Sequence, residues 1–218
     1  MENFERIICK NRQDWLDARL LGIGGSDASA VLGLNKYKTN VDLWQIKTNK
    51  KKPQKVDEEI VFYGTHAEDP LRKLFELTYK NKYKVTNNDF EILKSKKYPF
   101  MIGSLDGEIE DLENGEKGIY EGKTARINSK AAAQYWKDDI PLNYYIQILH
   151  YMLITGYSYA IINVELRYEI NDKIWFVRKI YRIDRKDVID DLKHLEEQEV
   201  KFWQFVEDNK EPPLTISF

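Results

Sequence analysis

The sequence predicts an α/β (α+β) fold in which a central mixed β-sheet is flanked by helices. Helical periodicity dominates about the first 80 residues, apolar and polar residues then alternate as in strands, and a charged amphipathic segment closes the chain. This order of elements is typical of helices packed on a sheet. Because no internal repeat and no long low-complexity linker interrupts the pattern, we expect residues 1–218 to form one domain.

The N-terminal part, about residues 1–80, is expected to be helical. Apolar residues at helical spacing predict helices over 11–20, from Ser26 or Asp27 to near Gly33, over 40–49 and over 58–79. Pro70 marks either a kink in the last of these or the first turn of a second helix. Residues 47–55 carry five lysines and no acid, which predicts a solvated loop.

The rest of the chain predicts strands and helices in mixed order. Strand patterns cover a hairpin over 82–93 that turns at Asn87-Asn88, a second pair over 100–110 and 117–124 that turns over Asp111–Gly115, and a third pair over 160–170 and 173–183 that turns around Asn171-Asp172. Helices are expected over 129–136 and 142–155, and the C-terminal helix over about 185–208.

Composition limits the classes of protein that fit. The charges nearly cancel, to a net −2, so overall charge carries no nucleic-acid signature. Cys9 is the only cysteine, which excludes a disulfide framework and a cysteine-rich metal site within one chain. No signal-peptide pattern follows Met1, and no apolar run approaches the roughly 18 residues that span a membrane. We therefore expect a cytoplasmic protein without a membrane partner.

One acidic hairpin carries the strongest chemical signal. Glu121 and Lys123 are two residues apart on a strand and point to the same face, and Asp106 lies in or next to the strand that precedes them. Two neighbouring carboxylates suit Mg²⁺ or Mn²⁺, and a lysine beside them is able to activate water or stabilise charge on a phosphate. Gly107 and Gly122 permit close approach of a ligand. On these residues alone, an ordinary surface ion pair remains an open alternative.

A second candidate region lies near the N-terminus. Arg19 is able to grip a phosphate with two donors. Ser26, beside Gly24 and Gly25 at a helix start, offers a hydroxyl and free backbone N–H groups to the same anion. The alternative for this stretch is an ordinary capped turn. A dinucleotide-binding motif is excluded, because no strand precedes the glycines and their spacing is wrong.

The remaining candidates are single helical residues. Gln147 and Tyr151 share one face of a predicted helix at i and i+4, where packing and function are both plausible. His66 and His150 invite a metal interpretation, but a structural or solvent-facing role is the commoner one for a lone histidine. An oxygen-only magnesium site needs neither of them.

The ordered set of motifs resembles a known nuclease superfamily. Asp106, Glu121-x-Lys123 and the helical Gln147 and Tyr151 resemble the PD-(D/E)xK superfamily, and the Gln-x-x-x-Tyr spacing resembles its RecB-like branch. The stretches RLLGIGGSDASAVLGLNKY (19–37) and YGTHAEDPLRKLFE (63–76) are similar to the YqaJ-type viral recombinase family, the relatives of phage lambda exonuclease. Leu105 departs from the proline that the superfamily name expects.

This resemblance implies a restriction-endonuclease-like core and a role for each matching residue. Asp106, Glu121 and the Gly122 carbonyl would ligate metal, and Glu68 would hold a second metal or its water. Lys123 would position or activate the attacking water, and Gln147 would orient substrate or support that lysine. The terminal 5′-phosphate and the DNA would be bound by Arg19, Ser26, Ser104 and Tyr151.

The resemblance also implies an activity and its partners. We expect a Mg²⁺-dependent 5′-to-3′ exonuclease, with Mn²⁺ as a possible substitute, that degrades one strand of linear double-stranded DNA. The 3′ single strands would serve recombination through a single-strand annealing protein. The family further implies a ring-shaped homotrimer, encoded by a phage or prophage and active in the cytoplasm of a bacterial host.

Two alternatives stay open at the level of sequence. One is a RecB-like endonuclease or another DNA nuclease. The other is a catalytically inactive DNA-binding or assembly module. The charge distribution suits DNA in each case, because residues 71–104 hold eight Lys/Arg against three acids.

Overall fold

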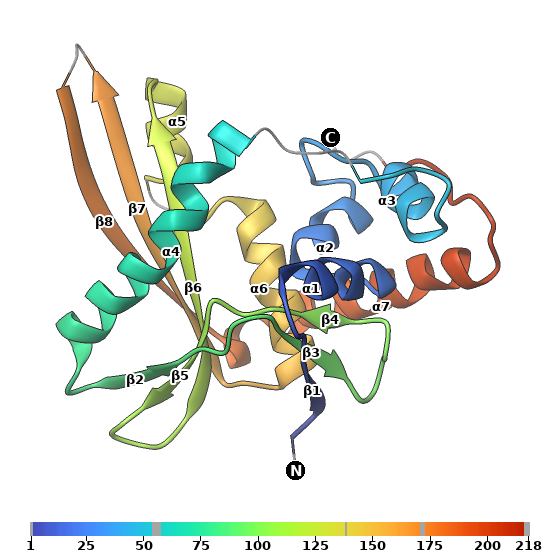
Figure 1. Ribbon diagram of the computed structural model, residues 1–218, viewed down its shortest axis with the longest axis horizontal. Coiled ribbons are helices and arrows are strands. Elements are labelled where there is room, and N and C mark those ends of the chain that lie inside the picture. Colours follow the sequence, from blue (N-terminus) through green and yellow to red (C-terminus); the bar gives the residue numbers. More distant parts are fainter. Residues whose placement is uncertain (1, 54–57, 138, 171–172, 216–218) are drawn as a thin grey trace.

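The computed structural model describes residues 2–53, 58–137, 139–170 and 173–215, and within them it confirms a mixed α/β fold (Figure 1). Its elements in chain order are β1 (Phe4–Ile8), α1 (Arg12–Ala18), η1 (Arg19–Leu21), α2 (Gly25–Val31), α3 (Asn40–Lys47), α4 (Glu58–Tyr79), β2 (Tyr83–Thr86), β3 (Glu91–Ser95), β4 (Ile102–Gly103), β5 (Gly107–Asp111), β6 (Lys117–Ile127), α5 (Lys130–Tyr135), α6 (Leu142–Thr155), β7 (Tyr159–Ile170), β8 (Lys173–Asp184), η2 (Arg185–Asp187) and α7 (Ile189–Glu207).

The central sheet has five strands in the order β2-β5-β6-β7-β8. Neighbouring strands are antiparallel except β6 and β7, which run parallel along ten paired residues and are connected through α5 and α6. A parallel pair requires such a crossover, and this one delivers α6 onto the sheet. The predicted mixed sheet is therefore confirmed, with β6 at its centre.

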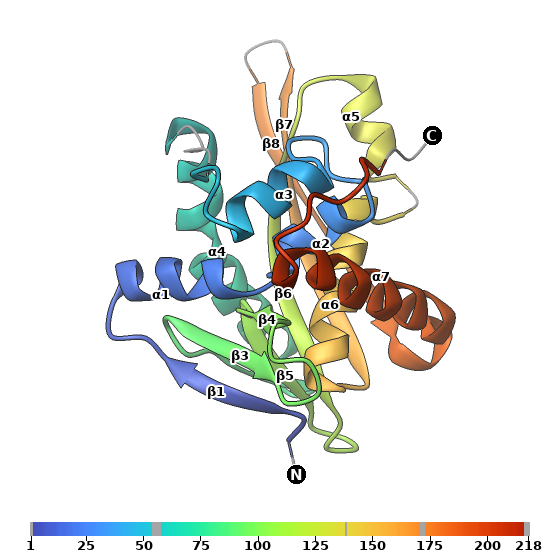
Figure 2. The same ribbon diagram turned by 90° about the vertical axis from the view of Figure 1, so that its right-hand side faces the viewer.

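Helices α4 and α6 cover opposite faces of this sheet, as Figure 2 shows. The amide of Asn163, on β7, donates to the Leu71 carbonyl of α4 from one face. On the other face, apolar residues of α6 join the main core with Ile119 and Ile162. Helices α2 and α7 pack outside α6, so α6 is buried between the sheet and a further helical layer.

A second sheet contains three antiparallel strands in the order β1-β3-β4. The hairpin predicted over 82–93 is wrong, because its two halves belong to different sheets. Val85 of β2 lies opposite Ile109 of β5, whereas Ile92 of β3 lies opposite Ile7 of β1. Phe90, with φ of 56°, lies between the two strands, where the chain passes from one sheet to the other.

Two other expectations in this region need correction. The strand predicted over 100–110 is interrupted, since β4 and β5 lie in separate sheets and residues 104–106 cross between them. The N-terminal part is not wholly helical, because β1 precedes α1. Only Phe4 of β1 is buried, so the strand lacks the alternation that would have revealed it.

Several turn and helix predictions hold, and others do not. The turn over Asp111–Gly115 is confirmed by the Gly115 N–H, which donates to the Asp111 carbonyl at 2.8 Å, and by a Gly115 φ of 73°. Helix α4 continues through Pro70, so no second helix begins there. The closing helix begins at Ile189, after the short turn η2. The turn expected at Asn171-Asp172 lies outside the described residues.

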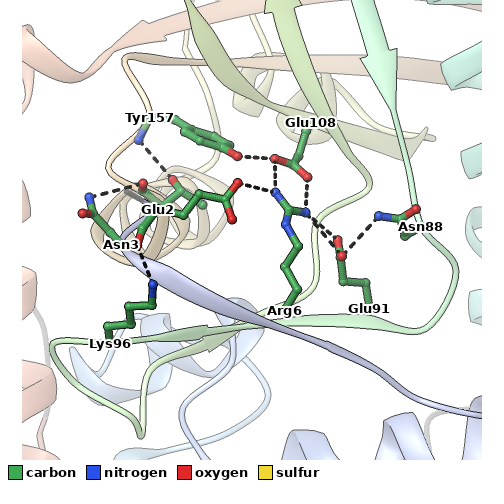
Figure 3. Close-up of polar contacts among 9 residues, drawn as sticks. Glu2, Asn3, Arg6, Asn88, Glu91, Lys96, Glu108 and Tyr157 are labelled. Atoms are coloured by element: carbon green, nitrogen blue, oxygen red, sulfur yellow. Dashed lines mark hydrogen bonds and ion pairs between the residues drawn. The ribbon is translucent and has the colours of Figure 1, made fainter.

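Arg6 fastens the small sheet to the large one (Figure 3). Its guanidinium, on β1, donates to both carboxylate oxygens of Glu108 on β5, at 2.5 and 3.0 Å. It also contacts Glu91 of β3 at 3.3 Å, and the Tyr157 hydroxyl donates to Glu108 from the segment after α6. Bidentate, charge-assisted contacts of this kind fix geometry. The two sheets that flank residues 104–106 are thereby held together.

A fully buried ion pair holds α7 against α6. His150 Nδ1 donates to Glu199 at 2.7 Å, and His150 Nε2 donates to the Ile102 carbonyl of β4 at 3.0 Å. Both ring nitrogens face acceptors, so the ring carries two protons. Burial lowers the pKa of His150, but the Glu199 carboxylate outweighs this and raises it above its usual value. His150 is therefore structural and sits away from solvent.

None of the helices in the described part of the chain is long and apolar enough to cross a bilayer.

We predict that Glu199→Gln lowers the free energy of unfolding by about 2 kcal/mol at pH 6, because the buried imidazolium loses its counter-ion. The folded pKa of His150 lies above its unfolded value, so this stabilisation is complete below about pH 6.5 and is lost as the pH rises through the folded pKa. Urea unfolding at pH 6 and pH 9 measures the difference, with the exposed Glu197→Gln as control. An equal loss at both pH values would contradict an ion pair.

Candidate active site

Asp106 and Glu121 are brought together as the sequence predicts. Asp106 ends the crossing between the two sheets, directly before β5, and Glu121 lies in the middle of β6. The Gly122 N–H donates to Asp106 Oδ2 at 2.9 Å. Arg72, on α4, donates to the Asp106 backbone carbonyl at 3.1 Å. Two elements thus fix the position of this carboxylate.

Glu121 is the buried acid of the site, with 1% of its surface exposed. Its Oε1 accepts from Lys123 Nζ at 2.5 Å and from Gln147 Nε2 at 2.7 Å. Its Oε2 is buried and has no hydrogen-bond partner among the described residues. Burial and the neighbouring Asp106 carboxylate raise the pKa of Glu121 to about 8. A buried oxygen without a partner beside a second carboxylate is the environment that a cation would relieve.

Lys123 is held among these acids. Burial lowers the pKa of its ammonium, but Glu121 and Asp106 outweigh this effect and raise it above its usual value. Its Nζ also lies 5.3 Å from the centre of the Tyr144 ring, on α6. Lys123 therefore stays protonated and fixed in direction, which suits a donor to an anion more than a free base.

Glu68 approaches the same cluster from α4, on the other side of Asp106. Partial burial and the Asp106 carboxylate raise the pKa of Glu68 to about 7, although its side chain opens to solvent. Lys123, Arg72 and Arg19 act on it in the opposite direction. The helical glutamate singled out in the sequence thus lies within electrostatic reach of the acidic pair.

A chain of hydrogen bonds on α6 supports Glu121. Gln147 Nε2 donates to Glu121 and also to the Tyr151 hydroxyl at 3.0 Å, and that hydroxyl donates to the Ser104 carbonyl at 2.9 Å. Tyr151 is buried, so it positions other groups and does not line an open surface. The chain links β6, α6 and the crossing segment that carries Asp106.

The glycine before Ser26 has a clear packing role. A Cβ on Gly25 would lie 2.6 Å from the Tyr151 ring, so only glycine lets α2 approach this tyrosine closely. At the preceding Gly24, the nearest atom would be the Asp27 carboxylate at 3.7 Å. Gly24 is also the N-cap of α2, so this helix begins before the start predicted at Ser26 or Asp27.

Arg19 is presented on an aromatic surface. Its guanidinium stacks on the Trp15 ring at 4.4 Å and makes no ion pair within the described residues. Trp15 Nε1 donates to Ser104 Oγ at 3.1 Å, and Ser104 Oγ donates to the Glu91 carbonyl at 2.9 Å. Ser104 therefore orients Trp15, which in turn orients Arg19. Ser26 is exposed, and its hydroxyl makes no hydrogen bond in the part of the chain described.

A second buried charge network joins Arg19 to α2. Lys47, whose side chain is 2% exposed, donates to the Arg19 carbonyl at 3.1 Å and pairs with Asp27 at 2.8 Å. Lys38 also pairs with Asp27. Lys47 ends α3 and is buried, so the solvated loop predicted from 47 is wrong at this residue. The sequence did not reveal this burial, because Lys47 belongs to a run of lysines that looks uniformly solvated.

The predicted residues thus form one acidic cluster with a basic region near it. Hydrogen bonds or adjacency in the chain connect Asp106, Glu121, Gly122, Lys123 and Gln147, and Glu68 lies within electrostatic reach of them. Within the described residues, no three His, Cys, Asp or Glu side chains converge as a ready metal cage. Sequence reasoning missed Trp15, Lys47, Asp27 and Arg72. His66 is exposed, and its interactions with the described residues are with its own helix, through the Phe62 carbonyl and ring.

Residues 14–158 match the model of the YqaJ-like viral recombinase domain, which is more than half of the chain. The chain belongs to the YqaJ-like viral recombinase family. It is 33% identical over 202 residues to the uncharacterized protein YqaJ of Bacillus subtilis (strain 168), a match that covers 90% of this chain and 58% of that protein. The chain therefore spans just over half the length of this curated relative.

Solved structures confirm the fold of this YqaJ-like chain. An alkaline exonuclease from Laribacter hongkongensis (LHK-Exo) superposes with a TM-score of 0.65 at 17% identity, covering 90% of this chain and 93% of that one. The same protein in complex with dAMP gives a TM-score of 0.64 at 18% identity, with the same coverage. At such low identity the similarity establishes the architecture.

We predict that Gly25→Ala lowers the free energy of unfolding by about 2 kcal/mol, because the added methyl group overpacks against Tyr151. Gly24→Ala is the matched control and should cost only about 0.5 kcal/mol, as a loss of N-cap preference. Urea unfolding measures both variants. Equal losses would show that the contact with Tyr151 does not limit position 25.

Proposed function

We propose that this chain is a Mg²⁺-dependent deoxyribonuclease that degrades one strand of linear double-stranded DNA from its 5′ end. The product would be a duplex with a 3′ single strand for recombination by strand annealing. The observation that carries this function is the buried, unpartnered Glu121 Oε2, set beside Asp106 and fixed by Lys123 and Gln147.

The donor set fits a hard divalent cation. Asp106 and Glu121 would supply carboxylate oxygens and Gly122 its carbonyl, while Glu68 would hold a second ion or its water. Mg²⁺ commonly binds one or two carboxylates together with water and substrate phosphate, so a three-carboxylate cage is not required. When bound, Mg²⁺ or Mn²⁺ would polarise the scissile phosphate and favour ionised water. It would also favour the ionised form of Glu121, whose pKa is otherwise near 8.

The chain's own side chains have separate tasks in this reaction. Lys123, protonated and fixed by Glu121, would donate to the attacking water or to the negative charge that develops on the phosphate. Gln147 would hold Glu121 and, through it, the direction of Lys123. Tyr151 and Ser104 act as positioning residues, because both are engaged in hydrogen bonds within the protein.

Attack at an end, and its direction, is supported by Arg19 and Ser26. The Arg19 guanidinium is stacked on Trp15 and is not paired with any acid that the structure describes, so its donors are available to a terminal phosphate. Ser26 is exposed beside α2, and Lys47 ties that helix to Arg19. The dAMP complex of LHK-Exo supports a DNA-derived ligand for a protein of this fold.

The same proposal includes partners that rest on the family resemblance. We expect a ring-shaped homotrimer that encloses the duplex and a single-strand annealing protein that receives the 3′ strand. We also expect a phage or prophage origin and activity in the bacterial cytoplasm. Light scattering of the full chain measures the assembly.

The deciding experiment follows a linear duplex labelled on one strand, with 5′-phosphate or 5′-hydroxyl ends, in Mg²⁺ and in EDTA. Stepwise Mg²⁺-dependent release from the 5′-phosphorylated strand is expected. Internal cuts would indicate a RecB-like endonuclease, and release from the 3′ end another nuclease. Binding without any cleavage in Mg²⁺ or Mn²⁺ would indicate an inactive DNA-binding module.

Arg19→Ala should slow digestion of 5′-phosphorylated ends by about tenfold or more, because charge-assisted contacts to the phosphate are lost. Ends with a 5′-hydroxyl should be affected little. The exposed Arg12→Ala, one helix earlier, is the matched control. Equal slowing on both kinds of end would remove Arg19 from a phosphate pocket.

Lys123→Ala should lower the cleavage rate by about 10³-fold, since a fixed donor to the developing charge is lost. Duplex binding in EDTA, followed by anisotropy, should stay close to that of the wild type. Lys123→Gln keeps a donor to Glu121 and tests the charge without leaving that carboxylate unpaired, and the exposed Lys117→Ala on the same strand is the control. Substantial cleavage by Lys123→Gln would exclude the ammonium from catalysis.

A further inference from the structure

The two edges of the central sheet are built very differently. The β2 edge is four residues long and carries Lys84 and Thr86, the short and polar design that normally protects an edge. The β8 edge is twelve residues long and contains no proline. It pairs with β7 along its whole length, and within the described residues no strand pairs with its outer side. Figure 1 shows β8 as the outermost strand.

The first half of β8, residues 173–178, exposes apolar side chains on both faces of the sheet. Ile174, Trp175, Phe176 and Val177 are each between 38% and 54% exposed. Trp175 stacks on Tyr168 of β7 at 5.2 Å, which fixes its ring in place. A long edge that has no proline and exposes four consecutive apolar side chains is suited to the addition of another strand.

Two cations frame this apolar run. Lys173 and Arg178 are exposed at its ends, and neither forms an ion pair within the described residues. The strand as a whole has four basic residues and one acidic residue. Because Lys173 and Arg178 are exposed and form no ion pair among the described residues, they favour an acidic segment at this edge.

This charge disfavours a second copy of β8. Antiparallel self-pairing would join two strands that together carry eight basic and two acidic residues, and like charges on neighbouring strands destabilise a sheet. DNA is also a poor match, because phosphates are bound by polar and basic groups and not by four exposed apolar side chains. An extended segment that alternates apolar and acidic residues satisfies both the backbone edge and the charge.

We propose that the outer edge of β8, Lys173–Asp184, docks an extended acidic and apolar segment of a partner protein by β-strand addition. Main-chain hydrogen bonds would supply much of the affinity, and Lys173 and Arg178 the preference for acids. This docking surface lies two strands away from Lys123, because β7 separates β6 from β8. It does not rest on the proposed nuclease activity.

A labelled synthetic peptide in which valine alternates with glutamate tests the preference on the full chain. By anisotropy, this peptide should bind, and a version with lysine in place of glutamate should bind at least about fivefold more weakly. Arg178→Glu should weaken the acidic peptide about fivefold, while the exposed Lys201→Glu of α7 should not. Absence of binding, or equal binding of both peptides, would overturn the proposal.

Amide hydrogen exchange tests the mode of binding. Addition of the acidic peptide should slow exchange along β8 and leave the opposite edge, β2, unchanged. Unchanged exchange in β8 despite binding would rule out strand addition. Self-association that Phe176→Glu abolishes would assign the edge to a second copy, and loss of duplex binding in Arg178→Glu without loss of the peptide would assign it to DNA. The exposed Leu77→Glu of α4 is the control for the added charge.

Discussion

A carboxylate with 1% of its surface exposed has to be matched by charge and hydrogen bonds, and much of the architecture around Glu121 serves that need. Lys123 supplies the charge from the same strand, and Gln147 supplies a donor from α6. Gln147 is itself fixed through Tyr151, which requires the absence of a side chain at Gly25. The close packing of α2, α6 and β6 therefore follows from the burial of one acid. The match remains incomplete at Oε2, where the site is open to a cation.

The second requirement is that Asp106 arrive from a different direction. Residues 104–106 cross between the two sheets, and both ends of this crossing are fixed. Arg6 holds the sheets together through Glu108, and the buried His150 holds the Ile102 carbonyl just before the crossing. A rigid crossing places the carboxylate against the Gly122 N–H without a regular strand to carry it. The small sheet contains none of the predicted metal ligands, but it helps to fix the position of the Asp106 carboxylate.

Local patterns in the sequence were enough to predict the helices and strands that bury one face. The helices 142–155 and 58–79, and the strands around Glu121, follow from periodicity, and the juxtaposition of Asp106 with Glu121-x-Lys123 follows from the hairpin turn at Gly115. Pairings between distant segments were not accessible: β2 and β3 look like a hairpin but find partners in different sheets. Lys47 was invisible for a related reason, because a lysine in a basic run becomes buried only through Asp27 and a distant carbonyl. The family resemblance implied that Arg19 and Ser26 belong to one site. The stacking of Arg19 on the Trp15 ring, in contrast, is visible only in the structure.

The net charge of −2 conceals two neighbouring regions of opposite sign. Around β6, the carboxyl groups of Glu68, Asp106 and Glu121 lie near the ammonium of Lys123 and the guanidinium of Arg72. Around α2, Arg19, Lys38 and Lys47 face one carboxylate, that of Asp27. The first region gathers carboxyl groups whose ionisation a divalent cation would favour, and the second has more cations than acids, which a phosphate would neutralise. Arg19 lowers the pKa of Glu68, so the two regions lie within electrostatic reach of each other. A metal-bound phosphodiester with a terminal phosphate carries both complementary charges, and for this reason the pair of regions supports the proposed DNA end as ligand over a metal ion or a phosphate alone.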